Sequence, residues 1–333
     1  MNKFEYLITR IIKMDYKNMF KIAKAISKKT NKNYFLIVLD IIRCGIKYQA
    51  GYYDYQEFEF YNLNNKERKT YLTRGKNNQI IRKFNDKSSF HKFDNKIELN
   101  TIFNDFLKRN WMMIDDNNFS EFQNFFKKNK AIIVKPIDES GGNGIEKFVY
   151  SEDIDCKELY EKLLNNKQFL IEECLKQHPK MNELYDKSVN TMRMFTFLKN
   201  GVPYFLQAVL KIGNGGIVDN FSSGGMYTYV DDTGYVYVEA LDRADNIYSV
   251  HPISNHKIVG FKVPMFKEAI KMVKEAAKVV PEIAYVGWDV AITANGPALI
   301  EGNSYPGIFQ AKPSLLEKKE GLIPKYNKEM KIF

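Results

Sequence analysis

The stretch Gly287–Gly307, GWDVAITANGPALIEGNSYPG, predicts two short strands joined by a tight turn. Val290, Ile292 and the run Ala298–Ile300 are apolar and typical of strands. Between them, Ala294–Pro297 contains an Asn-Gly-Pro sequence, which favours a turn. We therefore expect a β-hairpin in this segment.

Three oxygen-bearing side chains belong to this hairpin. Asp289 lies on its first strand, and Glu301 and Asn303 lie at the end of its second strand. Because Glu301 and Asn303 are two residues apart, their side chains share one face of an extended segment. Two carboxylates and an amide suit a hard cation such as Mg²⁺, which also takes oxygens from nucleotide phosphates. The alternative is a surface hairpin with ordinary turn polarity, and the hairpin alone does not decide between them.

Length and composition indicate a folded globular protein. The 333 residues are 44% hydrophobic and include 24 Phe and 21 Tyr, whereas disordered chains are poor in aromatic residues. The three cysteines are far apart and odd in number, which argues against a disulfide framework or a zinc site. The net charge of +10 favours an acidic partner, which could be a nucleotide, a phosphorylated substrate, a nucleic acid or an anionic membrane surface.

No stretch approaches the roughly 20 apolar residues that span a bilayer, so we expect no transmembrane segment. The first residues lack a secretory signal, which makes a cytoplasmic location the expectation. Residues 1–60 have apolar residues at helical spacing, and lysines such as Lys28 and Lys32 cover the other face. We favour a solvated basic face there over a membrane-binding or nucleic-acid-binding helix. From Gly51 to Lys96 the composition predicts only an irregular connector.

The rest of the chain predicts a mixed α+β fold. Helices are expected over residues 96–111, 119–128, 151–164, where Ser151 and Asp153 would cap the helix, and 264–280. Strands are expected over residues 131–135, 147–150 and 169–172, and as a pair on either side of Gly201.

A glycine-rich segment follows the strand that ends at Lys135. In Ser140-Gly141-Gly142-Asn143-Gly144 the backbone N–H groups could approach phosphate oxygens closely, with the Lys135 cation at the same end. A strand follows this segment rather than a helix, which excludes the common strand-to-helix phosphate loop and the dinucleotide turn. A glycine-rich turn without a ligand is the alternative.

Together these motifs resemble the ATP-grasp superfamily, and specifically its sugar-transfer-associated branch. Over about residues 130–312, five segments follow in order: IIVKPIDESGGNGI, FLIEECLKQH, SVNTMRMFTF, IVDNFSSGG and GWDVAITANGPALIEGNSYPG. The same order also resembles ligases that add glutamate to a ribosomal protein or to cofactors. The resemblance implies two α+β subdomains that clamp ATP, residues 96–185 and 186–333, preceded by a mostly helical region, residues 1–95.

The resemblance also implies roles for individual residues. The phosphates of the nucleotide would be bound by Lys135 and Lys96. The lid over them would be formed by Ser140, Gly141, Gly142 and Gly144. The hinge that contacts adenine and ribose would be formed by Glu172, Glu173, Cys174 and Leu175. Residues facing the reacting groups would be Arg193, Lys211 and Asn220, and the Mg²⁺ ligands Asp289, Glu301 and Asn303. Lys87 competes with Lys96 for its role, and Lys96 and Arg109 resemble a charged pair that precedes the clamp. The alternative for each of these residues is a surface charge on a helix.

One position departs from the dipeptide ligases of the superfamily. They carry an arginine two residues before the first metal carboxylate, where this chain has Gly287. Arg193 or Lys211 would have to supply that positive charge.

The implied activity is an ATP- and Mg²⁺-dependent ligase, with Mn²⁺ as an alternative ion. It would join a small-molecule carboxylate to an amine through an acyl phosphate, in surface polysaccharide assembly. A nucleotide-linked or lipid-linked sugar is among the candidate substrates, and nucleic acid is not an expected partner. The alternatives are an ATP-grasp kinase that phosphorylates a hydroxyl group, and a non-catalytic basic module that binds nucleic acid or anionic lipid.

Overall fold

The computed structural model describes residues 14–137 and 144–333, and the chain forms two compact units. The first unit runs through Lys83 and includes Ile308–Phe333, and the second is Phe84–Gly307. The predicted boundaries at residues 95/96 and 185/186 concern smaller subdomains and stay predictions.

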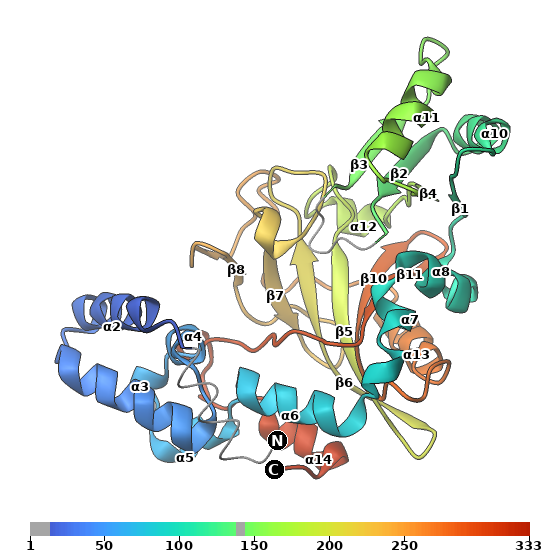
Figure 1. Cartoon of the computed structure of the whole chain (residues 1–333). Helices are drawn as coiled ribbons and strands as arrows, with labels where there is room; N and C mark the ends of the chain where they lie inside the picture. Colours follow the sequence, from blue (N-terminus) through green and yellow to red (C-terminus); the bar gives the residue numbers. More distant parts are fainter. Residues whose placement is uncertain (1–13, 138–143) are drawn as a thin grey trace. The chain divides into compact units, whose positions relative to one another are not determined.

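The first unit is helical. Its helices are α2 (Tyr16–Thr30), α3 (Tyr34–Tyr48), α4 (Tyr52–Glu57), α5 (Asn65–Thr70), most of α6 (Arg74–Phe84), and α14 (Ile323–Met330), with short 3₁₀ turns at Phe60–Asn62 and Pro313–Leu315 (Figure 1). Asp15 and Asn33 cap α2 and α3, and each accepts hydrogen bonds from the backbone of the first turn. The helices predicted within residues 1–60 are thus confirmed for the described part of the chain.

The expected irregular connector between Gly51 and Lys96 is wrong. This stretch forms α4, α5 and α6, then a 3₁₀ turn at Lys87–Ser89 and α7 (His91–Asp94). Fully buried aromatic rings, Phe58, Phe60 and Tyr71, hold the first part of it together. The helices are short and tied by local caps, such as the capping box at Asn64, so no long apolar period marks them in the sequence.

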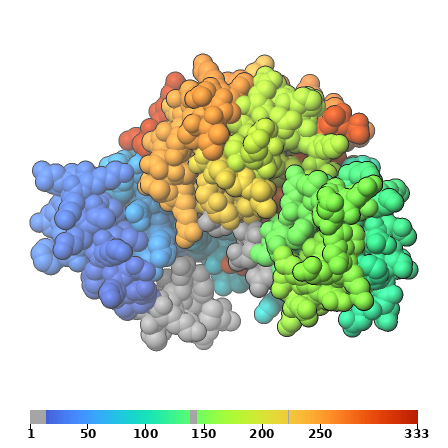
Figure 2. Space-filling model, turned by 90° about the horizontal axis from the view of Figure 1, so that it is seen from above, coloured from blue at the N-terminus to red at the C-terminus, as the bar shows by residue number. Residues whose placement is uncertain are grey.

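The second unit contains a four-stranded antiparallel sheet in the order β1-β4-β2-β3. Its strands are β1 (Trp111–Met113), β2 (Ala131–Lys135), β3 (Glu146–Val149) and β4 (Leu170–Glu173). Helices α10 (Phe119–Asn129) and α11 (Cys156–Asn165) share a core with one face of this sheet, which includes Phe122, Phe126 and Ile171. Figure 2 shows these helices, in green, at the surface of this part. The predicted helix over residues 119–128 and the three predicted strands are confirmed to within two residues.

Two predictions in this region need correction. Helix α11 begins later than expected, because Asp155 rather than Ser151 or Asp153 accepts the hydrogen bonds of the first turn. The helix expected over residues 96–111 is interrupted: α8 (Lys96–Ile102) and α9 (Asn104–Leu107) meet at Phe103, and the chain then turns at Lys108. Lys108 has a left-handed backbone with φ 50°, which ends the helix before β1.

A second, seven-stranded antiparallel sheet has the order β11-β10-β5-β6-β7-β8-β9. Its strands are β5 (Thr191–Lys199), β6 (Val202–Ile212), β7 (Met226–Val230), β8 (Ala240–Asp242), β9 (Ile247–Tyr248), β10 (Tyr285–Thr293) and β11 (Gly296–Asn303). Strands β10 and β11 are the predicted hairpin, and α13 (Phe266–Ala276) is the predicted helix before it. A short helix, α12 (Pro179–Asn182), precedes β5.

Alternation along the central strands divides this sheet into a core face and a site face. Met192, Met194, Trp288 and Val290 belong to the large hydrophobic core shared with α8, α9 and α13. The residues between them, Arg193 and Asp289 among them, therefore point to the opposite face. None of the helices described for residues 14–137 and 144–333 has the length and apolarity needed to cross a bilayer.

Candidate nucleotide and metal site

Asp289 lies at the centre of a buried charge cluster on the site face of the large sheet. Arg193 on β5 is its direct neighbour across the ladder, and donates from Nε to Oδ1 at 2.6 Å and from Nη2 to Oδ2 at 2.9 Å. Lys211 on β6 donates to the same Oδ2 at 3.1 Å. Three predicted site residues from different sequence segments are thus brought together by the strand order β10-β5-β6.

The two cations decide the protonation state of Asp289. Burial raises the pKa of this carboxyl, but the charges of Arg193 and Lys211 outweigh burial and hold the pKa well below its usual range. Asp289 is therefore ionised at neutral pH. Both of its oxygens accept hydrogen bonds from these two cations, so a bound metal ion would share the carboxylate with Arg193 and Lys211.

Glu301 and Asn303 lie beside Asp289 on the adjacent strand β11. Glu301 is the ladder partner of Asp289, and Asn303 is the partner of Gly287. The Asn303 Nδ2 atom donates to the Gly287 carbonyl at 3.2 Å and to Glu301 Oε1 at 3.4 Å. The side chain of Glu301 is 42% exposed, whereas that of Asp289 is 4% exposed. The predicted triad therefore combines one buried carboxylate with one open to solvent.

The pKa of Glu301 is raised, first by partial removal from water and then by the negative charge of Asp289. Arg193 opposes this increase from 3.9 Å away. The two carboxyls thus differ in character, and a divalent cation between them would favour the ionised form of both.

The donor set of this triad fits Mg²⁺. Magnesium is usually held by one or two carboxylates, with the remaining positions filled by water and substrate phosphates. Within the described residues no group of three His, Cys, Asp or Glu side chains could form a metal site by itself. A site with two carboxylates and an amide oxygen therefore suits an ion that shares its ligands with a nucleotide.

Gly287 leaves room for Arg193. A Cβ atom at this position would lie 2.9 Å from Cβ of Pro306, 3.3 Å from Cδ of Arg193 and 3.6 Å from its Nη1. The guanidinium group from the neighbouring strand thus reaches the space beside Gly287. The expectation that Arg193 supplies the positive charge missing from that position stays a prediction.

Asp219 is a further member of the cluster that the sequence reasoning missed. Its Oδ2 atom accepts hydrogen bonds from the backbone N–H and the hydroxyl of Thr191, at 2.7 and 2.5 Å. Its Oδ1 atom lies 3.8 Å from Nζ of Lys211. Burial lowers the pKa of Lys211, but Asp219 and Asp289 outweigh burial and raise it, so the ammonium keeps its charge.

Asn220 follows Asp219 directly and begins the 3₁₀ turn Phe221–Ser223. Its carbonyl accepts from the backbone N–H groups of Ser223 and Gly225. A Cβ at Gly225 would lie 2.3 Å from the Asp219 carbonyl oxygen, so only glycine fits there. The segment VDNFSSGG therefore forms a compact turn. The position of Asp219 directly before the predicted site residue Asn220 is the sequence feature that could have identified it.

A second buried cluster lies in the four-stranded sheet, around Glu172. Its Oε1 atom accepts from Arg109 at 2.7 Å and from Asn100 at 2.8 Å, and its Oε2 atom accepts from Lys135 at 2.5 Å. Burial raises the pKa of Glu172, but Arg109 and Lys135 outweigh it and depress the pKa far below the usual range. The predicted phosphate lysine and one predicted hinge residue are thus an ion pair in this structure.

Arg109 connects this cluster to the hairpin of β10 and β11. Besides Glu172, its guanidinium donates to the carbonyls of Leu299 and Ile300, at 2.5 and 3.3 Å. Both carbonyls belong to β11, directly before Glu301. Arg109 therefore bridges the strand that carries Glu172 and the strand that carries two predicted metal ligands.

Lys96 reaches the beginning of the glycine-rich segment. Its ammonium donates to the carbonyls of Pro136 and Ile137, at 3.0 and 3.1 Å. Lys87 lies exposed in a 3₁₀ turn. Lys96 thus lies next to the segment after Lys135, and its role as the second phosphate lysine stays a prediction.

The lid itself is described only in part. Ser140, Gly141 and Gly142 lie outside the described residues. Gly144 has φ +67°, and a Cβ there would lie 2.7 Å from Cγ of Pro136. The backbone at Gly144 thus requires glycine, as a tight turn after the segment would.

The other hinge residues differ from Glu172 in orientation. Glu173 accepts from the backbone N–H and the side-chain amide of Asn110, at 3.1 and 2.9 Å. The Cys174 backbone N–H donates to the Ala131 carbonyl at 3.1 Å, and Leu175 follows with its side chain half-buried. The side chains of Glu172 and Glu173 thus lie on opposite faces of β4.

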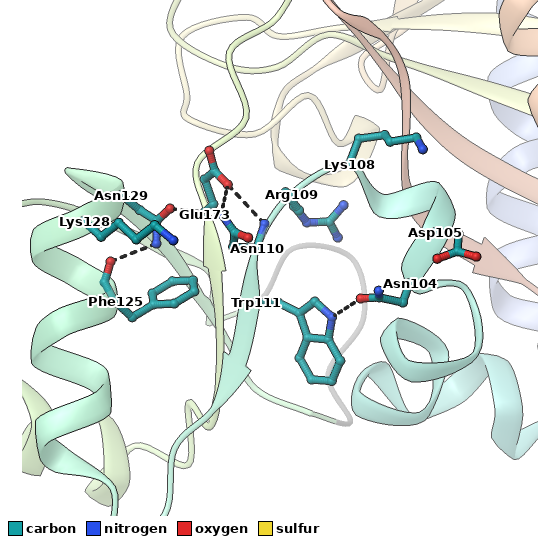
Figure 3. Close-up of a pocket in the computed structure, with 10 residues that line it drawn as sticks. All are labelled: Asn104, Asp105, Lys108, Arg109, Asn110, Trp111, Phe125, Lys128, Asn129 and Glu173. Carbon is teal, nitrogen blue, oxygen red and sulfur yellow. Dashed lines mark hydrogen bonds between the residues drawn. The ribbon is translucent and has the colours of Figure 1, made fainter.

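Glu173 lines a pocket of about 680 Å³ (Figure 3). Trp111 is one of the lining residues and donates from Nε1 to Oδ1 of Asn104 at 2.9 Å. The other lining residues are Asp105, Lys108, Arg109, Asn110, Phe125, Lys128 and Asn129. Lys135, Asp289 and Glu301 do not line it, so this pocket is separate from the predicted metal site.

Several solved structures are similar to this chain in fold. A D-alanyl-alanine synthetase A from Vibrio cholerae is 16% identical, with a TM-score of 0.42 over 71% of this chain and 60% of that one. The ATP-grasp ligase PsnB with a minimal precursor is 12% identical, with a TM-score of 0.40 over 67% and 56%. An L-amino acid ligase from Bacillus licheniformis is 13% identical, with a TM-score of 0.38 over 64% and 41%. This chain thus spans between 41% and 60% of these three proteins.

No curated protein sequence matches the chain. A family model described as sugar-transfer associated ATP-grasp matches residues 75–328. The matched range includes both sheets and every predicted site residue. The predicted α+β fold of ATP-grasp type, after a mostly helical N-terminal region, is thereby confirmed. This chain belongs to the sugar-transfer-associated ATP-grasp family.

Proposed function

We propose that this protein is an ATP- and Mg²⁺-dependent carboxylate–amine ligase that acts in surface polysaccharide assembly. The observation that carries the proposal is the buried cluster of Asp289, Arg193 and Lys211, which lies beside Glu301 and Asn303 on adjacent strands. The cluster combines fixed cations with oxygen ligands, as phosphoryl transfer requires. The family description adds the association with sugar transfer.

The proposed reaction has two steps. A substrate carboxylate oxygen forms a bond to the γ-phosphorus of ATP, the bond from that phosphorus to the bridging oxygen breaks, and ADP leaves. The amine nitrogen then attacks the carbonyl carbon of the acyl phosphate, inorganic phosphate leaves, and the nitrogen loses a proton. Neither step needs a nucleophile from the protein, which agrees with a site built from charges.

The chain's own residues would orient and neutralise the reacting groups. Arg193 and Lys211 are held in place by Asp289 and would face the phosphoryl group as its charge spreads over the oxygens. Lys135 and Lys96 would bind the phosphates next to the glycine-rich lid, which would exclude water from the acyl phosphate. Mg²⁺, or Mn²⁺ in its place, would be held by Asp289, Glu301 and Asn303, and when bound it neutralises phosphate charge.

Substrates follow from the same chemistry. The proposed substrates are a small-molecule carboxylate and an amine, one of them a sugar acid or an amino sugar, free or linked to a nucleotide or a lipid. Such precursors and ATP are available in the cytoplasm, which is the proposed location.

The test is a substrate screen that measures ADP release and product mass. Purified protein is incubated with ATP, Mg²⁺ and pairs of uronic acids or amino acids with amines. We expect ADP release that requires both partners, and a product whose mass equals carboxylate plus amine minus water. A product that gains a phosphate without incorporating the amine would establish the kinase instead. The ligase and the kinase would both be contradicted if no pair of substrates gave ADP release and the Asp289→Asn variant released as much ADP as the wild-type protein.

A further inference from the structure

Helix α3 presents an apolar stripe to solvent. Phe35, Leu39, Ile42 and Ile46 follow one another at spacings of four, three and four residues, so they form one line along the helix. Together with Leu36 they are between 44% and 72% exposed. Soluble proteins rarely expose four large apolar residues in line on one 15-residue helix. Where such a patch occurs, it commonly marks an interaction site.

The opposite side of α3 accounts for its packing within the first unit. Ile37, Ile41, Cys44 and Tyr48 are buried and belong to the core that α3 shares with α2 and α4. The helix therefore has two apolar sides, of which one is satisfied. Within residues 14–137 and 144–333, the core that includes this buried side contains none of the stripe residues.

The charges around the stripe are almost entirely positive. Residues 16–48 carry eight Lys and Arg side chains and one acidic residue, Asp40. Asp40 is bound by Arg68 at 2.6 Å and by Tyr55 at 2.8 Å, so its charge is neutralised inside the unit. Arg43 and Lys47, both exposed, flank the stripe on the row that begins with Leu36. The surface of α3 is thus apolar with a cationic border.

We propose that α3 docks this protein on an anionic lipid membrane, with the stripe buried at the level of the headgroups. Apolar residues on one face with lysine and arginine beside them are the features of an interfacial helix. At 1.5 Å per residue the helix is about 22 Å long, shorter than the roughly 30 Å hydrocarbon core, so it would lie in the membrane surface rather than span it.

The same features disfavour other occupants. A second copy of this chain packed stripe to stripe would bring Arg43 and Lys47 near their own counterparts. The carboxylate on the same helix row, Asp40, is already bound by Arg68 and Tyr55. A nucleic acid would use the cations but would leave five large apolar side chains without an apolar partner. Of these three occupants, the anionic membrane is the one that offers both negative charge and an apolar layer below its headgroups.

The test measures co-sedimentation of the full-length protein with vesicles of phosphatidylcholine, with and without about one third phosphatidylglycerol. We expect binding to the anionic vesicles and much weaker binding to the neutral ones. Leu39→Gln/Ile42→Gln should weaken binding at least about tenfold, because two apolar side chains no longer insert. Arg43→Gln/Lys47→Gln should weaken it by about 25-fold, at roughly fivefold for each cation.

The matched control is Lys267→Gln/Lys271→Gln. It removes two lysines at the same spacing from the exposed side of α13, and should bind vesicles like the wild-type protein. Thermal unfolding of each variant should match the wild type, since all of these side chains are exposed.

Three outcomes would overturn the proposal. The first is a wild-type protein that does not sediment with anionic vesicles. The second is loss of binding in the Arg43→Gln/Lys47→Gln variant but full binding in the apolar variant, which indicates purely electrostatic capture as for nucleic acid. The third is conversion of a dimer to a monomer by Leu39→Gln/Ile42→Gln, seen by light scattering, while vesicle binding stays unchanged.

Discussion

Replacing Glu172 with glutamine removes one negative charge from a buried cluster and leaves the shape of the side chain nearly unchanged. In the wild-type protein this carboxylate binds Arg109, Lys135 and Asn100, and its side chain is 3% exposed. Glutamine can keep one or two of these hydrogen bonds, but both cations lose their counter-ion. Leaving a buried charge unpaired costs about 3–5 kcal/mol, so we expect Glu172→Gln to lower the free energy of unfolding by about 3 kcal/mol.

Thermal and urea unfolding measure this loss. For a domain of roughly 200 residues, about 3 kcal/mol corresponds to a decrease in Tm of roughly 6–12 °C. The control is Glu173→Gln, the next residue on β4, which accepts hydrogen bonds from Asn110 near the surface. We expect this control to lose less than about 1 kcal/mol. Equal losses in the two variants would refute the claim that Glu172 anchors a buried ion cluster.

The pH dependence of stability provides a second check on Glu172. Its pKa in the folded protein is depressed below the ordinary value of 4.5, so the unfolded chain binds a proton more readily. The stability that comes from the carboxylate is therefore complete above pH about 4.5 and decreases as the pH falls toward the folded-state pKa. The difference in stability between the wild type and Glu172→Gln should shrink as the pH falls below this value. A difference that stays constant down to acidic pH would contradict the assignment.

Further predictions concern the two site clusters. Gly287→Ala should destabilise the protein by about 1–3 kcal/mol and displace Arg193, whereas Gly216→Ala, where a Cβ meets nothing closer than 3.9 Å, should be neutral in urea unfolding. Lys96→Ala should weaken ATP binding at least about tenfold in titration calorimetry, and Lys87→Ala should leave it unchanged. Asp289→Asn should decrease ADP formation by roughly a hundredfold or more once a substrate pair is known, and an active variant would contradict its role.

The sequence predicted strands β2 to β6, the hairpin β10–β11 and helices α10 and α13 of the second unit, because their apolar patterns are regular. It did not predict β1, β7, β8 and β9, of which three are only two or three residues long. The hairpin over residues 287–307 is the best example, since strand residues, turn residues and site residues alternate within it. The region from Gly51 to Lys96 was misread because its helices are only four to eleven residues long. Their stability comes from buried aromatic rings and caps, which leave no periodic pattern in the sequence.

Site residues could be predicted where they belong to a sequence motif. Contacts between residues of different segments could not be predicted, because they depend on the fold. Arg193, Lys211 and Asp289 come from three separate segments, and only the strand order makes them neighbours. The sequence gives no sign that Glu172 pairs with Lys135 or that Arg109 reaches the backbone of β11. Such pairs depend on register across strands, which side-chain spacing within one segment does not specify.

The central claim is that Asp289, Glu301 and Asn303 bind Mg²⁺ together with ATP. The most direct test is the affinity for a non-hydrolysable ATP analogue, measured by calorimetry with and without Mg²⁺, in the wild type and in Glu301→Gln. The side chain of Glu301 is more exposed than that of Asp289, so we expect a substitution of Glu301 to disturb folding less than one of Asp289. We predict that Mg²⁺ strengthens binding to the wild type at least about tenfold and has little effect on the variant. An equal effect of Mg²⁺ on both proteins would contradict the account.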